Sequence, residues 1–433
     1  MVSVHFYRER LLPSDYCIGL LMSGLNSDQM RTRCCIVGGG PAGMMLGLLL
    51  ARTGVDVMVL EKHSDFLRDF RGDTIHPSTL ELMYELGILE DLLRRPHQEV
   101  RELGGQIGPE FITIADFSHL VTHCKFIALM PQWDFLDFLA EHAGRYPAFQ
   151  LKMEAEAIDL LEEDGRIVGV RAKTRDGPLD IRADLIVGAD GRHSIVREKA
   201  ELQVDELGAP MDVLWFRVSR RSDDGEQTLG RIIRGKMMVM LNRDEYWQCA
   251  YLIRKGEFDR IKQTTLAAFW RDVVSVVPFL RDRMKELESW DQIKLLTVRV
   301  DQLRRWYRPG LLCIGDAAHA MSPIGGVGIN LAIQDAVAAA NILAMPLARG
   351  SISIADLQRV QRRRELPARI TQRVQVFIQD RLIRRILGTN EDIPVPWPMK
   401  LLKRWPFLRR IPARMVGVGF RSEHVKRGAM ETI

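Results

Sequence analysis

The chain has 433 residues, of which 46% are hydrophobic and 27% charged, and it carries a net charge of +5. That length exceeds one ordinary domain, and the composition excludes a disordered or collagen-like chain. No stretch approaches the roughly 18 consecutive apolar residues of a membrane-spanning helix. The nearest, residues 18–25, is short, and because Glu9 and Asp15 precede it we do not expect a secretory signal there. We expect a globular protein of two or three domains.

The six cysteines include no C-x-x-C pair, and they are Cys17, Cys34, Cys35, Cys124, Cys249 and Cys313. Three of them lie in apolar, strand-like runs. The pattern predicts small buried hydrophobic residues in a reducing compartment such as the cytoplasm, without a disulfide framework or a metal site.

The first regular elements begin after residue 30. Residues 1–30 match no pattern, and we expect a flexible N-terminal extension there. A short β-branched run over 32–37 predicts a buried strand, a glycine-rich turn follows, and residues 44–52 read as an apolar helix. A second buried strand over 55–60 completes a βαβ unit, the minimal dinucleotide-binding half-fold.

Further along the chain, two more buried strands, at 185–189 and 311–314, end in Asp190-Gly191 and Gly315-Asp316. Between them the pattern changes, and we expect antiparallel strands and then one helix. The predicted strands are 211–219, 231–241 and 245–254, and the helix runs from about 258 to 288. After Asp316 an alanine-rich helix is predicted over 327–347 and a basic helical stretch over 356–388. The fold class is α/β: a Rossmann-type domain with an inserted antiparallel-sheet domain and a C-terminal helical segment.

The glycine turn has the spacing G-x-G-x-x-G at Gly38, Gly40 and Gly43. The first glycine permits a sharp turn, the second lets a pyrophosphate approach the backbone, and the third permits close packing of helix on strand. The diphosphate then lies at a helix N-terminus. Glu61 ends the second strand, where a carboxylate accepts hydrogen bonds from an adenosine ribose.

Two fuller strings make the pattern specific. Residues 184–194 are Asp-Leu-Ile-Val-Gly-Ala-Asp-Gly-Arg-His-Ser, and residues 315–330 are Gly-Asp-Ala-Ala-His-Ala-Met-Ser-Pro-Ile-Gly-Gly-Val-Gly-Ile-Asn. With the glycine loop, they resemble the three fingerprints of the group A FAD-dependent aromatic monooxygenases, the p-hydroxybenzoate hydroxylase-like flavoproteins, over roughly residues 32–350. The resemblance implies an FAD-binding domain at 31–204 and 301–350, a substrate domain at 205–300, and a basic C-terminal segment and tail at 351–433.

The resemblance also implies which residues bind cofactors. FAD would contact Gly38, Gly40, Gly43, Glu61, Lys62, Arg71, Gln132, Asp190, Asp316, Gly326, Gly328, Ile329 and Asn330. The helix that begins near Gly328 would direct its positive end at the flavin's pyrimidine edge. The sequence contains no second G-x-G-x-x-G, so NADH or NADPH would bind transiently as electron donor.

Chemistry in this family needs little from side chains. Reduced flavin reacts with dioxygen to give a hydroperoxide, which hydroxylates an aromatic, typically phenolic, small molecule. Candidate catalytic residues are Arg71, His319 and Pro323, with a scaffold role favoured for His319. Candidate substrate contacts come from the middle sheet and are Trp215, Arg217, Met238, Met240, Trp247 and Tyr251.

The C-terminal part is strongly basic. From residue 359 to 427 there are 18 Lys and Arg against five Asp and Glu, an excess of 13 positive charges. Aromatic, apolar and basic residues are mixed around Trp397 and Trp405, which suits peripheral attachment to the inner face of an anionic membrane. A packing helix with a solvated arginine face, plus a tail held on the protein, is the alternative. No nucleic-acid-binding motif accompanies the charge, so we expect no nucleic-acid partner. Whether the protein forms a homodimer is not determined by the sequence.

Three other functions also stay open. A related flavoprotein halogenase or isoprenoid reductase would keep the flavin, although the halogenase signature Trp-x-Trp-x-Ile is missing and Ala318-His319 is atypical of the reductases. A hydroxylase of a membrane-borne quinone precursor would fit the basic tail. A non-catalytic flavoprotein would bind FAD that no nicotinamide reduces.

Overall fold

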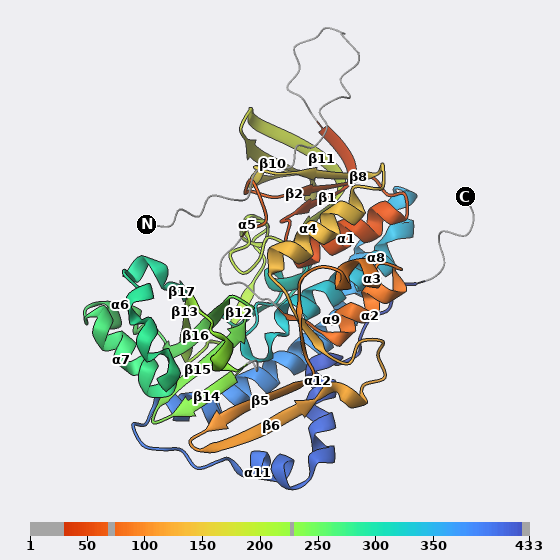
Figure 1. Ribbon diagram of the computed structural model, residues 1–433. Coiled ribbons are helices and arrows are strands. Elements are labelled where there is room, and N and C mark those ends of the chain that lie inside the picture. Colours follow the sequence, from red (N-terminus) through yellow and green to blue (C-terminus); the bar gives the residue numbers. More distant parts are fainter. Residues whose placement is uncertain (1–29, 68–73, 226–228, 427–433) are drawn as a thin grey trace.

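The computed structural model describes residues 30–67, 74–225 and 229–426 (Figure 1). The expected N-terminal extension, apart from Met30, lies outside these ranges, as do Cys17 and Arg71. The other five cysteines are buried free thiols, and burial raises the pKa of Cys35 to about 12.

The first sheet confirms the predicted dinucleotide-binding unit. Strand β1 pairs in parallel with β2 on one side and β11 on the other, in the order β20-β11-β1-β2-β8. Because its strands are covered on both faces, they read as continuous apolar runs. The elements of this unit are β1 (Met30–Val37), α1 (Pro41–Arg52), β2 (Val57–Leu60), β8 (Phe149–Lys152), β11 (Gly177–Gly188) and β20 (Leu311–Cys313).

Helix α1 lies between α4 (Gln132–Ala143) and α8 (Gly328–Ala348), and α9 (Ile354–Ile378) packs on α8. The strands β9 (Glu156–Glu163) and β10 (Arg166–Thr174) extend this sheet at the end farthest from the second sheet (Figure 1). The stretch Ile324–Ala348 is long and apolar enough to cross a membrane by length and composition alone, but 67% of its apolar window is buried inside the protein. That burial is typical of a core helix.

The second sheet is built mainly from the predicted antiparallel strands. Its order is β17-β13-β16-β15-β14-β5-β6, so residues 102–116 join it from far away in the sequence. The single strand predicted over 231–241 is a hairpin, because Arg234 and Gly235 turn the chain with φ of 41° and 76°. The strands are β5 (Glu102–Ile107), β6 (Glu110–Asp116), β13 (Met211–Ser219), β14 (Leu229–Ile233), β15 (Lys236–Asn242), β16 (Tyr246–Arg254) and β17 (Lys294–Leu296).

The outer face of this sheet packs on α7 (Leu266–Val276), as the left side of Figure 1 shows. The helix predicted over 258–288 is broken into α6 (Phe258–Lys262), α7 and a 3-10 segment (Pro278–Glu286). Thr265 starts a new helix because its Oγ1 accepts a hydrogen bond from Ala268 N at 3.2 Å. The inner face of the sheet packs on the end of the basic helical stretch through Ile383, Ile386 and Leu387.

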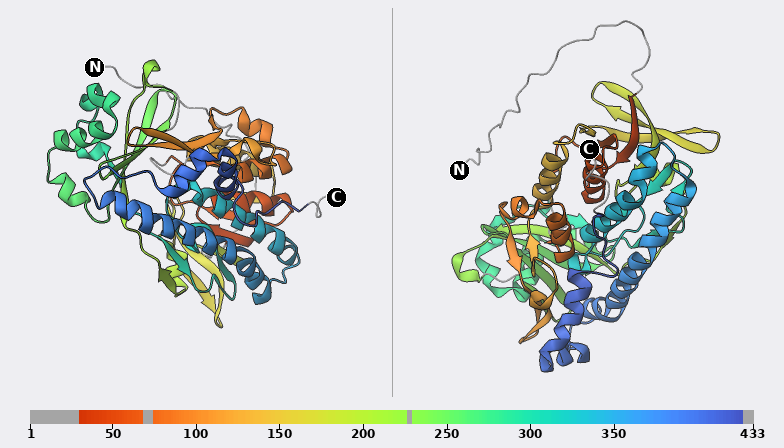
Figure 2. Two further views of the ribbon diagram at one scale, coloured as in Figure 1. Left: turned by 90° about the horizontal axis from the view of Figure 1, so that it is seen from below. Right: turned by 90° about the vertical axis from the view of Figure 1, so that its right-hand side faces the viewer.

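The C-terminal stretch is helical, as predicted, and begins at a Ser353 capping box. After α9 it continues through a π-turn (Gln379–Ile383), α10 (Arg384–Leu387), α11 (Trp397–Arg404), a 3-10 turn (Pro406–Arg409) and α12 (Arg410–Gly417). Helices α11 and α12 project at one end of the molecule (Figure 2, right). The smaller elements are β3 (Thr74–Ile75), α2 (Pro77–Glu85), α3 (Leu89–Leu93), β4 (Gln98–Val100), β7 (Ile127–Leu129), α5 (Ile195–Lys199), β12 (Val204–Glu206), β18 (Asp301–Leu303) and β19 (Tyr307–Arg308).

Candidate active site

The glycine loop joins the end of β1 to α1. Gly38 has φ +108°, and a Cβ there would lie 2.5 Å from Ala189 O. A Cβ on Gly43 would lie 1.9 Å from Gly38 O, so both positions require glycine for packing. At Gly40 the nearest atom would be 4.0 Å away. The loop is therefore tight at its base and open at Gly40, which precedes the helix N-terminus.

Glu61 follows β2 at the edge where this loop lies. Its Oε2 accepts a hydrogen bond from Gly39 N at 3.1 Å, and its Oε1 accepts one from His63 N at 3.1 Å. The carboxylate therefore lies directly beside the glycine loop, and the neighbouring Lys62 side chain is exposed.

A second glycine-rich loop, residues 323–328, precedes α8. Gly325 and Gly326 have φ of 78° and 63°, and a Cβ on Gly326 would lie 2.5 Å from Thr74 Oγ1. Thr74 Oγ1 donates a hydrogen bond to Gly326 O at 3.0 Å, which fixes the loop against β3. A Cβ on Gly328 would meet nothing within 4 Å. The first turn of α8 is therefore open on the side of Gly328.

The side chain of Asn330, which belongs to the predicted flavin-contacting turn, is held by hydrogen bonds within the protein. Its Oδ1 accepts hydrogen bonds from His76 N at 2.9 Å and Thr79 Oγ1 at 2.7 Å, and its Nδ2 donates to Thr74 O at 3.2 Å. Because the amide is committed to the protein and is buried, it ties α8 to β3 and α2. Only the backbone N–H groups of this turn are left to face a ligand.

Other predicted cofactor residues lie along the same edge of the first sheet. Asp316 sits half-buried in the turn that follows β20, Gln132 is the first residue of α4, and Ile329 is the second residue of α8. Pro323 begins the second glycine loop, and its neighbour Ile324 packs with residues of the second sheet's inner face. This loop therefore lies between the two sheets.

Asp190 follows β11 beside the first glycine loop. Its Oδ2 accepts a hydrogen bond from Val196 N at 3.2 Å, and burial raises the pKa of its carboxyl. Its Oδ1 is buried and has no hydrogen-bond partner among the described residues. Nearby, the buried Arg197 pairs with Asp301 at 3.2 Å and also donates to Arg192 O, which fixes the turn after Asp190.

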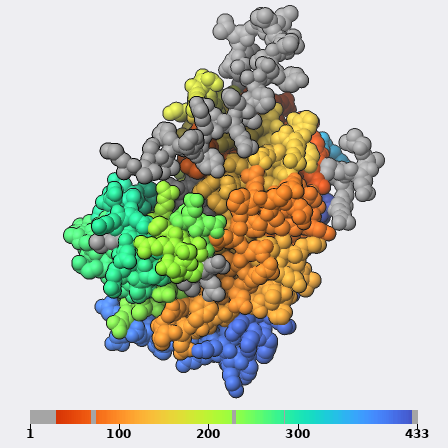
Figure 3. All heavy atoms as spheres, in the orientation of Figure 1, coloured from red at the N-terminus to blue at the C-terminus, as the bar shows by residue number. Residues whose placement is uncertain are grey.

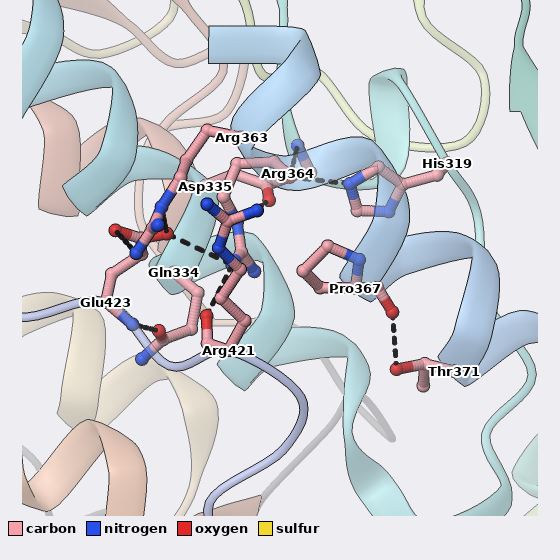
Figure 4. A network of polar contacts seen from close by, with 10 residues as sticks. His319, Gln334, Asp335, Arg363, Arg364, Pro367, Thr371, Arg421 and Glu423 are labelled. Carbon is pink, nitrogen blue, oxygen red and sulfur yellow. Dashed lines mark hydrogen bonds and ion pairs between the residues drawn. The ribbon is translucent and has the colours of Figure 1, made fainter.

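His319 belongs to a buried polar network (Figure 4). Its Nε2 lies 2.5 Å from Asp335 Oδ2, which also accepts a hydrogen bond from Gly315 N at 3.1 Å. Arg364 Nε donates to the other oxygen of Asp335 at 2.9 Å. Burial alone would raise the pKa of Asp335, but the charges of His319 and Arg364 hold it below its ordinary value. The arrangement supports the predicted scaffold role of His319, because the network holds the turn that carries Asp316.

The six predicted substrate contacts fall on opposite faces of the second sheet. Met238, Met240, Trp247 and Tyr251 point outward and pack with α7, in a core where each is at most 6% exposed. The structure therefore does not bring these four to the glycine loops. Alternation along the strands decides this, since neighbouring residues point to opposite faces.

Trp215 and Arg217 lie on the inner face of the same sheet. Trp215 packs in a cluster that includes Ile324 from the second glycine loop. Arg217 is exposed and is paired across the strands with Gln248. Gln248 is 5% exposed, and its Nε2 has no hydrogen-bond partner among the residues described.

No sequence pattern pointed to Thr74, Asp335, Arg364 or Gln248, and His76 was only a histidine of uncertain role beside His319. One signal was available, because Asp335 is a lone acid within an alanine-rich apolar helix, and such residues are rarely buried without a partner. The partners of Thr74, His76 and Arg364 lie between 29 and 340 positions away, so no local pattern indicates them.

These features suit a dinucleotide with an attached flat ring. The open position at Gly40 lies where a pyrophosphate meets a helix N-terminus. The open position at Gly328 lies at the start of α8, across the edge of the same sheet. The residues present therefore fit FAD, and the fold and site define a Rossmann-type flavoprotein.

Comparison with known proteins agrees with this class. Residues 31–374 match the family model of the FAD binding domain. The chain is 33% identical to 6-methylpretetramide 4-monooxygenase of Streptomyces rimosus over 395 residues, which is 90% of this chain and 93% of that protein. It is 28% identical to the uncharacterized aromatic compound monooxygenase YhjG of Bacillus subtilis over 71% of this chain but only 60% of that protein. The crystal structure of p-nitrophenol 4-monooxygenase PnpA from Pseudomonas putida shares the fold, with a TM-score of 0.74, 19% identity, and coverage of 92% of this chain and 100% of that one.

The chain belongs to this FAD-binding family. It is an FAD-dependent monooxygenase, and its reaction is the hydroxylation of an aromatic compound.

Proposed function

We propose that this enzyme takes electrons from NADH or NADPH and hydroxylates a phenolic small molecule with dioxygen. The observation that carries the proposal is the 33% identity to 6-methylpretetramide 4-monooxygenase across nearly the full length of both chains. The sequence contains no second G-x-G-x-x-G. This supports a nicotinamide that binds transiently, reduces the flavin and leaves.

In this proposal the edge of the first sheet holds FAD. Gly38, Gly40 and Gly43 with Glu61 bind its ADP half, and Asp316 hydrogen-bonds its ribityl chain. The backbone N–H groups at the start of α8 face the pyrimidine edge, where the helix dipole stabilises negative charge on the reduced ring. When bound, FAD supplies the activation of dioxygen and the oxygen transfer.

The inner face of the second sheet holds the substrate. Trp215 offers an aromatic surface close to the glycine loop of residues 323–328, because it packs in the same cluster as Ile324 of that loop. Arg217 makes no ion pair with any described residue. Gln248 beside it has a buried Nε2 without a hydrogen-bond partner among those residues, while its Oε1 accepts a hydrogen bond from Arg243 Nε at 3.2 Å. A guanidinium and an amide N–H both donate hydrogen bonds, so together they suit a phenolate or carbonyl oxygen.

The decisive experiment is anaerobic reduction of the FAD-loaded enzyme by NADH and then by NADPH, with and without a panel of phenols. We expect one nicotinamide to bleach the flavin and one class of phenol to accelerate the bleaching. If neither nicotinamide bleaches it under any condition, the proposed donor is wrong.

The substrate site is tested by Arg217→Gln. We expect an increase of about tenfold in KM for the accelerating phenol, since a charge-assisted hydrogen bond contributes roughly 1.5–3 kcal/mol, while flavin reduction without substrate stays unchanged. The matched control is Arg271→Gln, an exposed arginine on α7 at the outer face. An unchanged KM for Arg217→Gln would remove Arg217 from the site.

A further inference from the structure

The segment from Trp397 to Phe420 exposes large apolar side chains that a folded protein normally covers. Trp397, Trp405, Phe407 and Ile411 are 72%, 49%, 61% and 59% exposed. The two tryptophans are the only exposed ones among the residues that the structure describes. Several large apolar side chains exposed within one segment are typical of an interaction site.

The same segment is basic throughout. Residues 393–422 contain seven Lys and Arg and no Asp or Glu. Trp397, Lys400 and Arg404 are exposed at helical spacing on α11, so they share one face, while Leu401 and Leu402 are half-buried. Lys403 pairs with Glu110 at 2.6 Å and anchors α11 to β6. Lys400 and Arg404 form no ion pair within the described part of the chain.

Helix α12 continues this surface. Its Arg410, Ile411 and Arg414 are exposed, and together with Met415, Gly419 and Phe420 they line a surface cavity of about 320 Å³. Two guanidinium groups beside an apolar lining match a phosphate attached to a hydrocarbon. Figure 3 shows the C-terminal atoms in blue at the lower rim of the molecule, next to the orange residues of β5 and β6.

We propose that the surface formed by α11, the turn of residues 406–409 and α12 binds the face of an anionic lipid bilayer. The aromatic and aliphatic side chains enter the headgroup region, and the Lys and Arg side chains contact lipid phosphates. Charge selects this occupant over a second copy of the chain. A symmetric dimer would place the patch against itself and bring together six Lys and Arg from each copy, with no Asp or Glu within residues 397–417 to offset them.

The patch is also connected to the FAD site. Val416, in α12, accepts a hydrogen bond from His76 Nδ1 at 2.7 Å, and His76 N donates to Asn330 Oδ1 at the start of α8. An enzyme docked through α12 would therefore hold its second glycine loop close to the membrane surface. Such a position gives direct access to aromatic substrates that partition into lipid.

The test is flotation of the full-length FAD-loaded enzyme with vesicles. We expect binding to mixed phosphatidylcholine–phosphatidylglycerol vesicles and little to phosphatidylcholine alone, with binding falling as salt increases. Absence of binding to the anionic vesicles at low salt would overturn the proposal.

Two variant pairs separate the charge from the apolar contact. The double variant Lys400→Gln/Arg404→Gln should weaken vesicle binding about 25-fold, at about fivefold for each cation removed. The control Lys173→Gln/Arg271→Gln, which removes two exposed cations elsewhere on the protein, should leave vesicle binding unchanged. Trp397→Ser with Phe407→Ser should weaken it about tenfold or more, against the control Leu366→Ser, which is 57% exposed on α9. All four sets change exposed side chains, so bound flavin and turnover of a water-soluble phenol should stay unchanged.

Two results would overturn the proposal even if vesicles bind. The first is equal binding by the Trp397→Ser/Phe407→Ser variant and its control. The second is that light scattering shows a dimer of the wild type and a monomer of this variant, while vesicle binding stays the same. The patch would then be an interface between copies of the chain. Neither result bears on the hydroxylation reaction, which the reduction experiment tests separately.

Discussion

Asp335 offers the sharpest test of how the FAD site is supported. Its carboxylate is fully buried and accepts hydrogen bonds from Gly315 N and Arg364 Nε, beside His319. Asp335→Asn keeps the shape but removes the charge, which leaves the buried Arg364 short of a counter-ion. Removing one partner of a buried pair typically costs about 3–5 kcal/mol.

We expect the lower end of that range, about 3 kcal/mol. Arg364 keeps two other contacts, with Glu423 Oε1 at 3.4 Å and Arg421 O at 3.3 Å. The pKa of Asp335 lies below its ordinary value of 3.8. The contribution of the Asp335 carboxylate to the free energy of unfolding is therefore fully present above pH 3.8. It is lost only as the pH falls below that value and through the folded-state pKa.

The assay is urea unfolding at neutral pH, followed by far-ultraviolet circular dichroism, together with titration of FAD into the apoprotein. The control is Asp380→Asn, because Asp380 pairs with Arg384 at 2.8 Å but both side chains are about half-exposed or more, at 48% and 67%. Such a pair contributes at most about 1 kcal/mol. If the free energy of unfolding of Asp335→Asn lies within about 1 kcal/mol of the wild-type value and the variant binds FAD normally, the network does not support the turn that carries Asp316.

Two further changes test the second glycine loop and its contacts. Gly326→Ala should weaken FAD binding about tenfold or more, because a Cβ would lie 2.5 Å from Thr74 Oγ1 and displace the loop. The control Gly54→Ala shares the positive φ, at +76°, and its backbone strain of roughly 1–2 kcal/mol, but its Cβ would meet open space, so the FAD dissociation constant should stay unchanged. Equal effects on FAD binding would refute the steric argument. Burial lowers the pKa of His76 from 6.5 to about 4. Between these pH values the folded state therefore binds fewer protons than the unfolded state, so the free energy of unfolding should fall by about 3 kcal/mol as the pH falls from 6.5 to 4. His76→Asn, which keeps a donor for Val416 O, should flatten this part of the stability curve, and an unchanged curve would show that another group controls it.

The sequence by itself determined the parts of the fold that depend on local patterns. The βαβ unit, the strands at 211–219 and 245–254, and the helices after Asp316 follow from hydrophobic period and glycine spacing, and all are present with boundaries within a few residues. The FAD class followed too, because the turn at Gly38, Gly40 and Gly43 is set by neighbours along the chain. Steric demands of that kind are written into consecutive residues.

The tertiary structure decided which residues meet. Strand alternation shows that Trp247 and Arg217 lie on opposite faces, but only the packing of α7 and of the loop at Ile324 shows which face is turned toward the cofactor loops. The contacts of Asn330 with His76, of Asp335 with Arg364, and of Val416 with His76 join residues up to 340 positions apart. No periodicity records such contacts, because they arise only when separate elements bury one another's polar groups and each group must find a partner.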